Sequence, residues 1–261
     1  MSDNPYQESN HASDLTQVEK GFGNTLVKVV GLLGVAVILF ALVLPAIVRD
    51  AKPAVRVHQC KQNLRQISLA LSNYHAVNDA YPPAYTVDAM GRPLHSWRTL
   101  LLPYLDQHHL YKTIDLSKPW NDPANALACE TALHVYRCPS VAELPPNYTT
   151  YLAPVGPDRC FLPNGSRRIP DIASTSNTLM VFDASSGKKV HWMAPQDDDG
   201  QFVMSLTTET ELAHTGHTQA CLVDGSITFL SDDTPVDERR SLLSITRHEI
   251  SNGKANTDAA P

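Results

Sequence analysis

The sequence predicts an α+β protein in which one long N-terminal helix packs against an antiparallel β-sheet. Residues 29–48 carry no charge, apolar side chains recur at spacings of three and four from Val57 to Tyr74, and two apolar segments flank the Asp224-Gly225 pair. The first pattern indicates a helix that is apolar all round, and the second indicates a helix with one apolar face. The third predicts a β-hairpin, because Asp-Gly supplies the backbone angles of a tight turn.

The uncharged stretch is long enough to cross a bilayer. Its residues, at about 1.5 Å of helical rise each, cover roughly the 30 Å of a hydrocarbon core. A buried core helix is the alternative, but a globular helix rarely runs for about five turns without a polar face. A cleaved signal peptide fits poorly, because the apolar run exceeds an h-region and no small-x-small site ends it. We therefore expect a single transmembrane helix over residues 24–50, kinked at Pro45.

Beyond Pro53 the predicted helix is no longer apolar all round but amphipathic, with one apolar stripe. This stripe is expected to pack on the protein's own sheet, since three heptads are short for a coiled coil. The helix should end at about Val77, before the Tyr81-Pro82-Pro83 sequence. The positions on the apolar face are Val57, Cys60, Leu64, Ile67, Leu71 and Tyr74, and those on the polar faces are Arg56, Lys61, Gln62, Arg65 and Ser72.

The chain is expected to divide into four parts. Residues 1–23 are polar and acidic and read as a disordered tail. Residues 24–50 form the transmembrane helix, and 51–250 form the soluble domain, which includes the amphipathic half of the helix to about residue 77. Residues 251–261 read as a disordered C-terminus.

The hairpin from Gln219 to Leu230 gives the clearest register prediction. A two-residue turn at Asp224-Gly225 would set Leu222 opposite Ile227 and Ala220 opposite Phe229, with these four apolar side chains on one face. Other short elements are expected on both sides of it: helices at 96–105, 127–137 (passing into a strand) and 237–250, and strands at 149–152 and 178–183.

Composition and charge narrow the class of protein. The 261 residues carry a net charge of −6 without any run of Lys or Arg, so nucleic acid is not an expected partner. Nineteen prolines against twelve glycines favour a loop-rich β domain. No C-x-x-C pair supports a zinc cluster, although an extracytoplasmic domain could hold one or two disulfides. The five cysteines are Cys60, Cys129, Cys138, Cys160 and Cys221.

Two groups of polar residues are candidate cation ligands, but we expect no metal or other cofactor. In the HTGH sequence, His214 and His217 offer two imidazoles, with His191 and Asp224 as further ligands, yet Gly216 favours a loop in which His214 makes an ordinary hydrogen bond. An acidic cluster containing Asp197 and Asp199 could hold calcium, although it lacks the alternating spacing of an EF-hand loop and reads equally as a solvated turn.

Catalytic motifs give no support for an enzyme. Ser185 to Lys188 fits S-x-x-K, but the S-D-N and K-T-G companions of that motif are absent. The sequence contains no nucleophile elbow, P-loop, dinucleotide fingerprint or H-E-x-x-H. Asp106 with His108 and His109 could form an acid–base set, but polar residues that end a short helix explain them as well.

Several long motifs resemble a planctomycete family, the domain of unknown function 1559. The motifs of its first half are QCKQNLRQISLALSNYHAVNDAYPP, SWRTLLLPYLDQHHLY and VYRCPS, and those of its second half are IPDIASTSNTLMVFD, WMAPQD and HTGHTQACLVDGSITFLS. GNTLVKVVGLLGVAVILFALVLPAI is similar to the prepilin-type N-terminus of type IV pilins and type II secretion pseudopilins. The resemblance covers Asn24 to Ser231 and implies a pseudopilin-like fold, a long helix packed on an antiparallel sheet, without implying a biochemical activity.

The prepilin-like segment departs from the motif at its charged position. An ungapped match, anchored by Thr25 and Pro45, puts Gly23 and Asn24 at the cleavage junction and Lys28 where a glutamate is expected. In pilus-type assembly that glutamate offsets the N-terminal amine of a neighbouring subunit, whereas a lysine adds repulsion. Lys28 can instead extend its amine to the membrane interface. We therefore expect an uncleaved anchor that does not join a filament through the usual contact.

The resemblance also bears on the cysteines and on orientation. Cys60 and Cys138 occupy the two recurring cysteine positions of the family, so they either form a disulfide that ties the helix to the sheet or remain two separately buried thiols. Basic residues are fewer before the span than after it, which favours a cytoplasmic domain. The prepilin resemblance favours the opposite orientation, which we follow: a cytoplasmic tail and an extracytoplasmic domain on the inner membrane.

The functional expectation is a single-pass, membrane-anchored, pseudopilin-like protein without enzymatic activity. It would act structurally or by binding proteins of the cell envelope or of a secretion or pilus-like assembly, with the bilayer as its other partner. The alternatives are a membrane-tethered metal-dependent hydrolase that uses the region of His191, His214, His217 and Asp224, and an extracytoplasmic ligand-binding module. A convergent pocket with shared ligands would favour the hydrolase.

Overall fold

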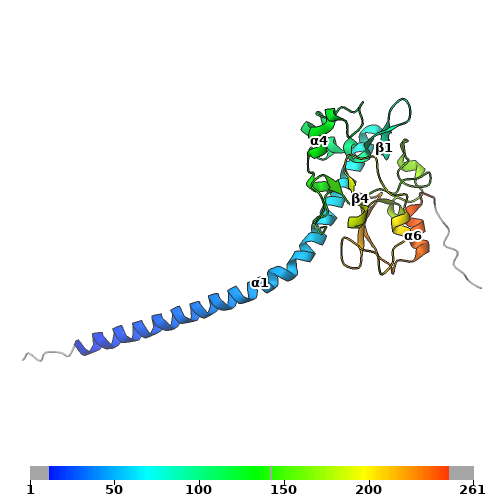
Figure 1. Ribbon diagram of the computed structural model, residues 1–261. Helices are drawn as coiled ribbons and strands as arrows, with labels where there is room; N and C mark the ends of the chain where they lie inside the picture. Colours follow the sequence, from blue (N-terminus) through cyan, green and yellow to red (C-terminus); the bar gives the residue numbers. More distant parts are fainter. Residues whose placement is uncertain (1–11, 142, 247–261) are drawn as a thin grey trace, which may run out of the picture. The chain divides into compact units, whose positions relative to one another are not determined.

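The protein has an α+β fold in which a long N-terminal helix packs against antiparallel sheets. The computed structural model describes residues 12–141 and 143–246, and among these the side chains of 28–35, 37–38 and 53 onward (Figure 1). The chain divides into two units, residues 1–54 and 55–261. Helix α1 spans Ala12–Asn78 and contributes to both units.

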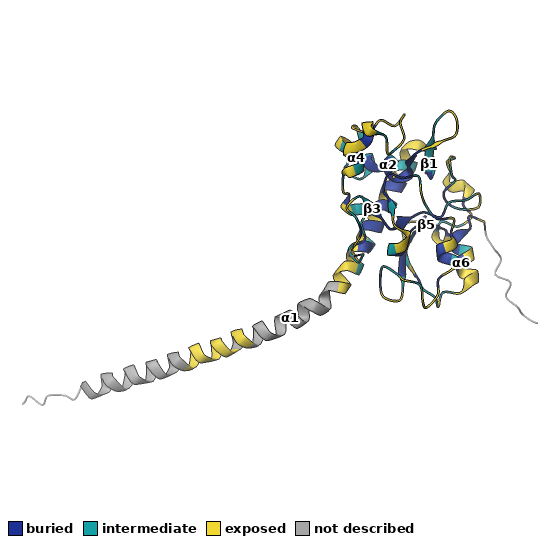
Figure 2. Cartoon of the chain, viewed as in Figure 1, coloured by how far each residue is buried: buried dark blue, intermediate teal, exposed yellow. Residues whose placement is uncertain are grey.

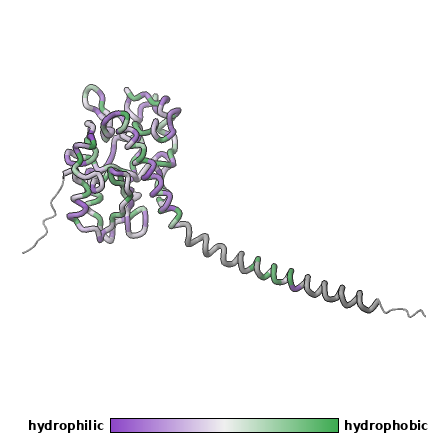
Figure 3. Tube along the Cα trace, turned by 180° about the vertical axis from the view of Figure 1, so that it is seen from behind, coloured by the Kyte–Doolittle hydropathy of each residue, from purple (hydrophilic) through white to green (hydrophobic). Residues whose placement is uncertain are grey.

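The first unit consists of the leading part of α1. The helix begins at Ala12, not at Asn24, so residues 12–23 are helical where a disordered tail was expected; residues 1–11 lie outside the described residues. Leu15, Gln17 and Glu19 favour helix, and extending an existing helix adds one hydrogen bond per residue. Figure 2 colours the described part of this helix as exposed, and Figure 3 shows that the same part is mostly hydrophobic. Its described apolar side chains are all exposed: Val29, Val30, Leu32, Leu33, Val35, Val37 and Ile38.

The predicted transmembrane segment falls only in part on described side chains. Those of residues 24–27, 36 and 39–50 are outside the described set. Among the residues that the structure describes, no helix combines the length and the apolar character that a membrane span requires.

The second unit begins with the amphipathic part of α1, which the sequence predicted. Cys60, Leu64, Ile67 and Leu71 are fully buried, and Val57 and Tyr74 are half-buried at the ends of the same stripe. The predicted polar positions Arg56, Gln62, Arg65 and Ser72 are exposed, and Lys61 is half-exposed. The helix ends at Asn78, and Asp79 follows in the left-handed region with a φ of 55°, which cannot continue the helix.

The strands of the described residues form three antiparallel sheets. The largest has the order β4-β5-β7-β8 and confirms the predicted strands near residues 149–152 and 178–183. Its strands are β4 Tyr151–Leu152, β5 Leu179–Asp183, β7 Thr218–Leu222 and β8 Ile227–Leu230; β1 Tyr85–Val87 pairs with β2 Pro93–Ser96, and β3 Tyr148–Thr149 pairs with β6 Val190–His191.

The hairpin exists, but its predicted register is wrong by one residue. Cys221 pairs with Ile227 and Ala220 with Thr228, because the connection is not a two-residue turn. The Gly225 amide donates to Leu222 and the Leu222 amide to Ser226, and only Gly225 has a positive φ, 86°. This is a three-residue loop with a bulge at glycine. A one-residue slip reverses the faces of one strand relative to the other.

Short helical segments complete the second unit. The predicted helix at 96–105 is confirmed as α2 and η1, whereas the strand expected before Arg137 is the 3₁₀ turn η3. The closing helix α6 ends at Leu243, where Ser244 turns to extended backbone. Their bounds are α2 Trp97–Leu100, η1 Leu102–Tyr104, α3 His108–Tyr111, η2 Pro123–Asn125, α4 Ala126–Glu130, η3 His134–Tyr136, η4 Ile169–Asp171, η5 Thr175–Asn177, η6 Ser186–Lys188, α5 Gln201–Met204 and α6 Val236–Leu243.

The four-stranded sheet has an apolar cluster on each face. On one face Val181 and Cys221 pack with the buried stripe of α1. On the other face Phe182 and Ala220 pack with residues of α5 and α6 (Figure 2). The sheet is therefore the middle layer of the second unit, and side chains at the ends of its strands can meet α1 directly.

Candidate functional site

Four side chains that can bind a metal converge where α1 meets the four-stranded sheet. Cys60 comes from α1, Cys138 from the segment after η3, Asp183 from the end of β5, and His214 from the turn before β7. One ligand atom from each lies within 4.8 Å of the corresponding atom of every other, and all four residues are buried. We refer to these four residues as the Cys-Asp-His cluster.

Local structure explains why each residue reaches this point. Cys60 belongs to the apolar stripe, so the amphipathic pattern alone turns it toward the sheet. Asn63, one turn further along α1, donates a hydrogen bond of 3.0 Å to the carbonyl of Arg137 and so holds the segment that carries Cys138. His214 forms an isolated antiparallel bridge with His217 across a turn in which Gly216 has a φ of 74°.

The distances within the cluster are those of direct contact. The Sγ atoms of Cys60 and Cys138 lie 2.7 Å apart, and His214 Nε2 lies 3.7 Å from Cys138 Sγ and 3.4 Å from Asp183 Oδ2. Both cysteines are free thiols in the structure, since a disulfide bond is about 2.05 Å long. The predicted disulfide therefore remains a prediction, but its two cysteines do come together.

Hydrogen bonds outside the cluster fix the orientation of two members. Thr150 Oγ1 donates to Asp183 Oδ1 at 2.5 Å, while Asp183 Oδ2 is buried without a hydrogen-bond partner. His214 Nδ1 lies 3.2 Å from Ser140 Oγ, and Gln219 Nε2 lies 3.4 Å from His214 Nε2. Thr150 thus holds Oδ1 of Asp183 and Ser140 contacts Nδ1 of His214, while Asp183 Oδ2 and His214 Nε2 face each other at 3.4 Å.

Burial and the neighbouring groups favour a proton on the Cys138 thiol and on the His214 imidazole. The hydrogen bond with Cys60, together with burial, raises the pKa of the Cys138 thiol far above its ordinary value. Burial lowers the pKa of His214, but the facing Asp183 carboxylate and Cys138 sulfur more than offset this and raise it to about 9. The protonated His214 imidazole faces Asp183 Oδ2 at 3.4 Å and lies beside the neutral Cys138 thiol.

Of the predicted histidine and aspartate ligands near the HTGH sequence, only His214 joins the cluster. His217 stacks edge-on against Phe229 and its Nδ1 lies 3.1 Å from the carbonyl of Thr215. His191 is buried elsewhere, with Nε2 2.9 Å from the carbonyl of Cys129 and Nδ1 accepting from Met193. Asp224 lies in the hairpin turn and accepts from Ser226.

The acidic cluster does not converge on a common point. The Asp197 side chain is only 4% exposed and pairs with Arg98 at 2.6 Å, while Asp198 accepts from the amides of Gly200 and Phe202. Asp199 is exposed and accepts from the amide of Gln201. These carboxylates serve one internal ion pair and the start of α5. Among the described residues they form no group of metal-ligand geometry.

Sequence reasoning missed Asp183 as a site residue, although it placed this residue correctly at the end of a strand. The available signal was a carboxylate that closes the buried run LMVFD, because a charge in that position needs a partner. Its partner, His214, comes from a turn 31 positions further on. Only the pairing of β5 with β7 brings the two together.

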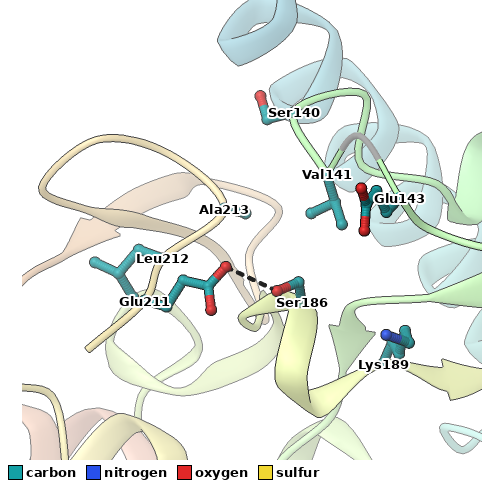
Figure 4. A pocket seen from close by; sticks show the side chains of 8 residues that line it. All are labelled: Ser140, Val141, Glu143, Ser186, Lys189, Glu211, Leu212 and Ala213. Carbon is teal, nitrogen blue, oxygen red and sulfur yellow. Dashed lines mark hydrogen bonds between the residues drawn. The ribbon is translucent and has the colours of Figure 1, made fainter. Parts of the chain in front are cut away.

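A surface pocket lies next to the cluster without including it. The pocket holds about 320 Å³, and its wall carries Glu143, Glu211, Ser186 and Lys189, with Ser186 Oγ donating to Glu211 Oε1 at 2.9 Å (Figure 4). Ser140 also lines it, and it is Ser140 that contacts His214 from behind. None of the four cluster residues lines this pocket.

The fold and the site define a class of protein: an α+β domain on a long N-terminal helix, with two cysteines, an aspartate and a histidine buried at the helix–sheet contact. The chain belongs to the family described as protein of unknown function (DUF1559), whose model matches residues 49–210. The resemblance noted in the sequence is therefore confirmed for that range, whereas the prepilin-like segment and the HTGH motif lie outside it. No curated protein and no solved structure matches the chain.

Proposed function

We propose that this protein is a single-pass membrane protein of pseudopilin-like architecture whose α+β domain acts by contact with other proteins of the cell envelope and has no catalytic activity. The proposal places residues 29–48 in the inner membrane, the short N-terminal tail in the cytoplasm and the domain on the extracytoplasmic side. Because Lys28 replaces the glutamate of the prepilin motif, the N-terminus is expected to stay uncleaved.

The observation that carries the proposal is the exposure of apolar side chains on every side of α1 between Val29 and Ile38. All seven described apolar residues larger than alanine in this range are exposed. Successive helical positions are about 100° apart, so the seven cover the full circumference of the helix. Leaving each in water instead of an apolar medium costs about 1.5–3 kcal/mol, and a bilayer removes this cost without any protein partner.

Two features of the site support a role without catalysis. A catalytic zinc site keeps one coordination position open to water and substrate, whereas all four members of the Cys-Asp-His cluster are buried. The pocket beside the cluster is lined by none of them. The hydrolase alternative needs a pocket that shares ligands with the metal-binding residues, and the described pocket does not meet that condition.

Arginine substitutions test the membrane assignment. The double variant Leu33→Arg/Ile38→Arg is expected to leave the membrane fraction during an alkaline carbonate wash, whereas the wild-type chain stays in it. Each arginine near the middle of a span costs about 2.5–3.5 kcal/mol on insertion scales, so two reduce insertion strongly. The amount of full-length protein in the pellet and in the supernatant is measured by immunoblot.

A matched control comes from the same helix. Leu69 is also an exposed leucine on α1, but it lies in the second unit, so Leu69→Arg should stay in the membrane pellet with the wild type. Release of the wild-type chain by carbonate would refute the proposal, and so would retention of the double variant.

A further inference from the structure

We propose that Cys60, Cys138, Asp183 and His214 form a closed, four-ligand zinc site that fastens helix α1 to the four-stranded sheet. The donor set is the first argument. Two sulfur atoms, one imidazole nitrogen and one carboxylate oxygen are a set that zinc accepts in tetrahedral geometry. Calcium and magnesium prefer oxygen ligands throughout, so the two cysteines exclude them as the preferred ions.

The spacing of the four donor atoms is the second argument. All of them lie within 4.8 Å of one another, as the ligands of a single small ion must. Zinc–sulfur bonds of about 2.3 Å in a tetrahedron would set the two sulfur atoms roughly 3.8 Å apart. The observed separation is 2.7 Å, so zinc would move Cys60 Sγ and Cys138 Sγ apart by about 1 Å.

The surroundings of the cluster already orient two ligands as a metal site requires. A zinc-bound histidine usually makes a hydrogen bond through its other ring nitrogen, and here Ser140 faces His214 Nδ1 while Nε2 faces the cluster. Thr150 holds Asp183 Oδ1, which leaves Oδ2 buried without a hydrogen-bond partner. His214 Nε2 lies 3.4 Å from this oxygen. A buried carboxylate oxygen without a hydrogen bond is costly, and coordination to a cation would satisfy it.

Binding of Zn²⁺ to the four residues changes the charges of the ligands in a defined way. Zn²⁺ binds cysteine as thiolate and histidine through an unprotonated ring nitrogen, so any protons on these atoms pass to water when the ion binds. The bound ion then faces two thiolates, one carboxylate and one neutral imidazole. Because the ligands come from α1, the segment after η3, the end of β5 and the turn before β7, the site would join four segments that are far apart in the sequence.

Metal content and thiol content test the proposal together. The full-length chain, purified in detergent without chelator or reductant, should contain about one zinc per chain by plasma mass spectrometry. All five cysteines should react with a thiol reagent after denaturation in the presence of a chelator. A chain without zinc in which only three thiols react would hold a disulfide instead, and this result would overturn the proposal.

Cobalt substitution and single variants assign the ion to this cluster. Replacement of zinc by Co²⁺ should give the visible absorption of a tetrahedral ion and a near-ultraviolet thiolate charge-transfer band. Cys138→Ser and His214→Gln should each lower the zinc content to background. Cys221→Ser replaces an equally buried cysteine outside the cluster and should keep the ion.

The zinc content of the variants and of the wild-type chain decides whether the cluster binds zinc. If Cys138→Ser does not fold, the zinc content and the cobalt spectrum of the wild-type chain still decide the question. Retention of zinc by a folded Cys138→Ser variant would overturn the proposal. Neither readout depends on the membrane assignment, because metal content and carbonate extraction are independent measurements.

Discussion

Replacing Asp197 by asparagine is expected to destabilise the second unit by about 3–5 kcal/mol, because it leaves a buried guanidinium without its counter-ion. The Arg98 side chain is fully buried and the Asp197 side chain is 4% exposed, and their closest atoms are 2.6 Å apart. Asp197 also accepts hydrogen bonds from Trp97 Nε1 and from the amide of Ala153. Asparagine has nearly the same shape, so the substitution isolates the loss of charge.

The measurement is denaturant unfolding of the full-length chain in detergent, followed by the fluorescence of the three tryptophans, all of which lie in the second unit. Asp237→Asn is the matched control, because it removes the carboxylate of an exposed pair with Arg240. Exposed pairs contribute about 0–1 kcal/mol. A loss below about 1 kcal/mol for Asp197→Asn would show that the Arg98 charge is not buried as described.

Replacing Leu71 by alanine is expected to cost about 2–5 kcal/mol of unfolding free energy, because Leu71 is fully buried in the stripe that packs α1 on the sheet. The cost combines the lost transfer of the side chain out of water with the cavity that remains. The same fluorescence-detected denaturation measures it.

Leu69 provides the control for the same chemical change. It lies two positions away on the same helix and is 63% exposed, so Leu69→Ala should change the free energy of unfolding by less than about 0.5 kcal/mol. Equal effects at the two positions would mean that this face of α1 is not the one that contacts the sheet.

The sequence predicted most accurately the structural features that depend on local periodicity, such as the buried face of α1. The stripe from Val57 to Tyr74 follows from a 3.6-residue period, and in the structure its four central positions are buried and its two end positions half-buried. The hairpin was also predicted, but its register depends on turn geometry. In the structure Val223 and Asp224 have negative φ angles, and the bulge is at Gly225. An Asp-Gly pair occurs in two-residue and in longer turns, so the pair alone does not predict this loop length.

The candidate site was only partly predictable because its members are brought together by tertiary structure. The family positions of Cys60 and Cys138 left a disulfide and two separately buried thiols as alternatives, and the HTGH motif drew attention to His214. The same motif suggested His217, whose ring lies instead against Phe229. Asp183 became a candidate only when strand pairing placed the end of β5 beside the turn before β7. Sequence spacing carries no information about such a contact.

Labelling of single introduced cysteines tests the central claim, a single-pass anchor with its domain outside the cytoplasm, most directly. Met90 is 76% exposed in the second unit, and Ser9 lies in the N-terminal tail. In intact cells, a small membrane-impermeant maleimide should label Met90→Cys and should label Ser9→Cys only after the inner membrane is permeabilised. Cys129→Ser in both variants removes the one native cysteine that is not fully buried. Protection of Met90→Cys in intact cells, or labelling of both positions there, would contradict the account.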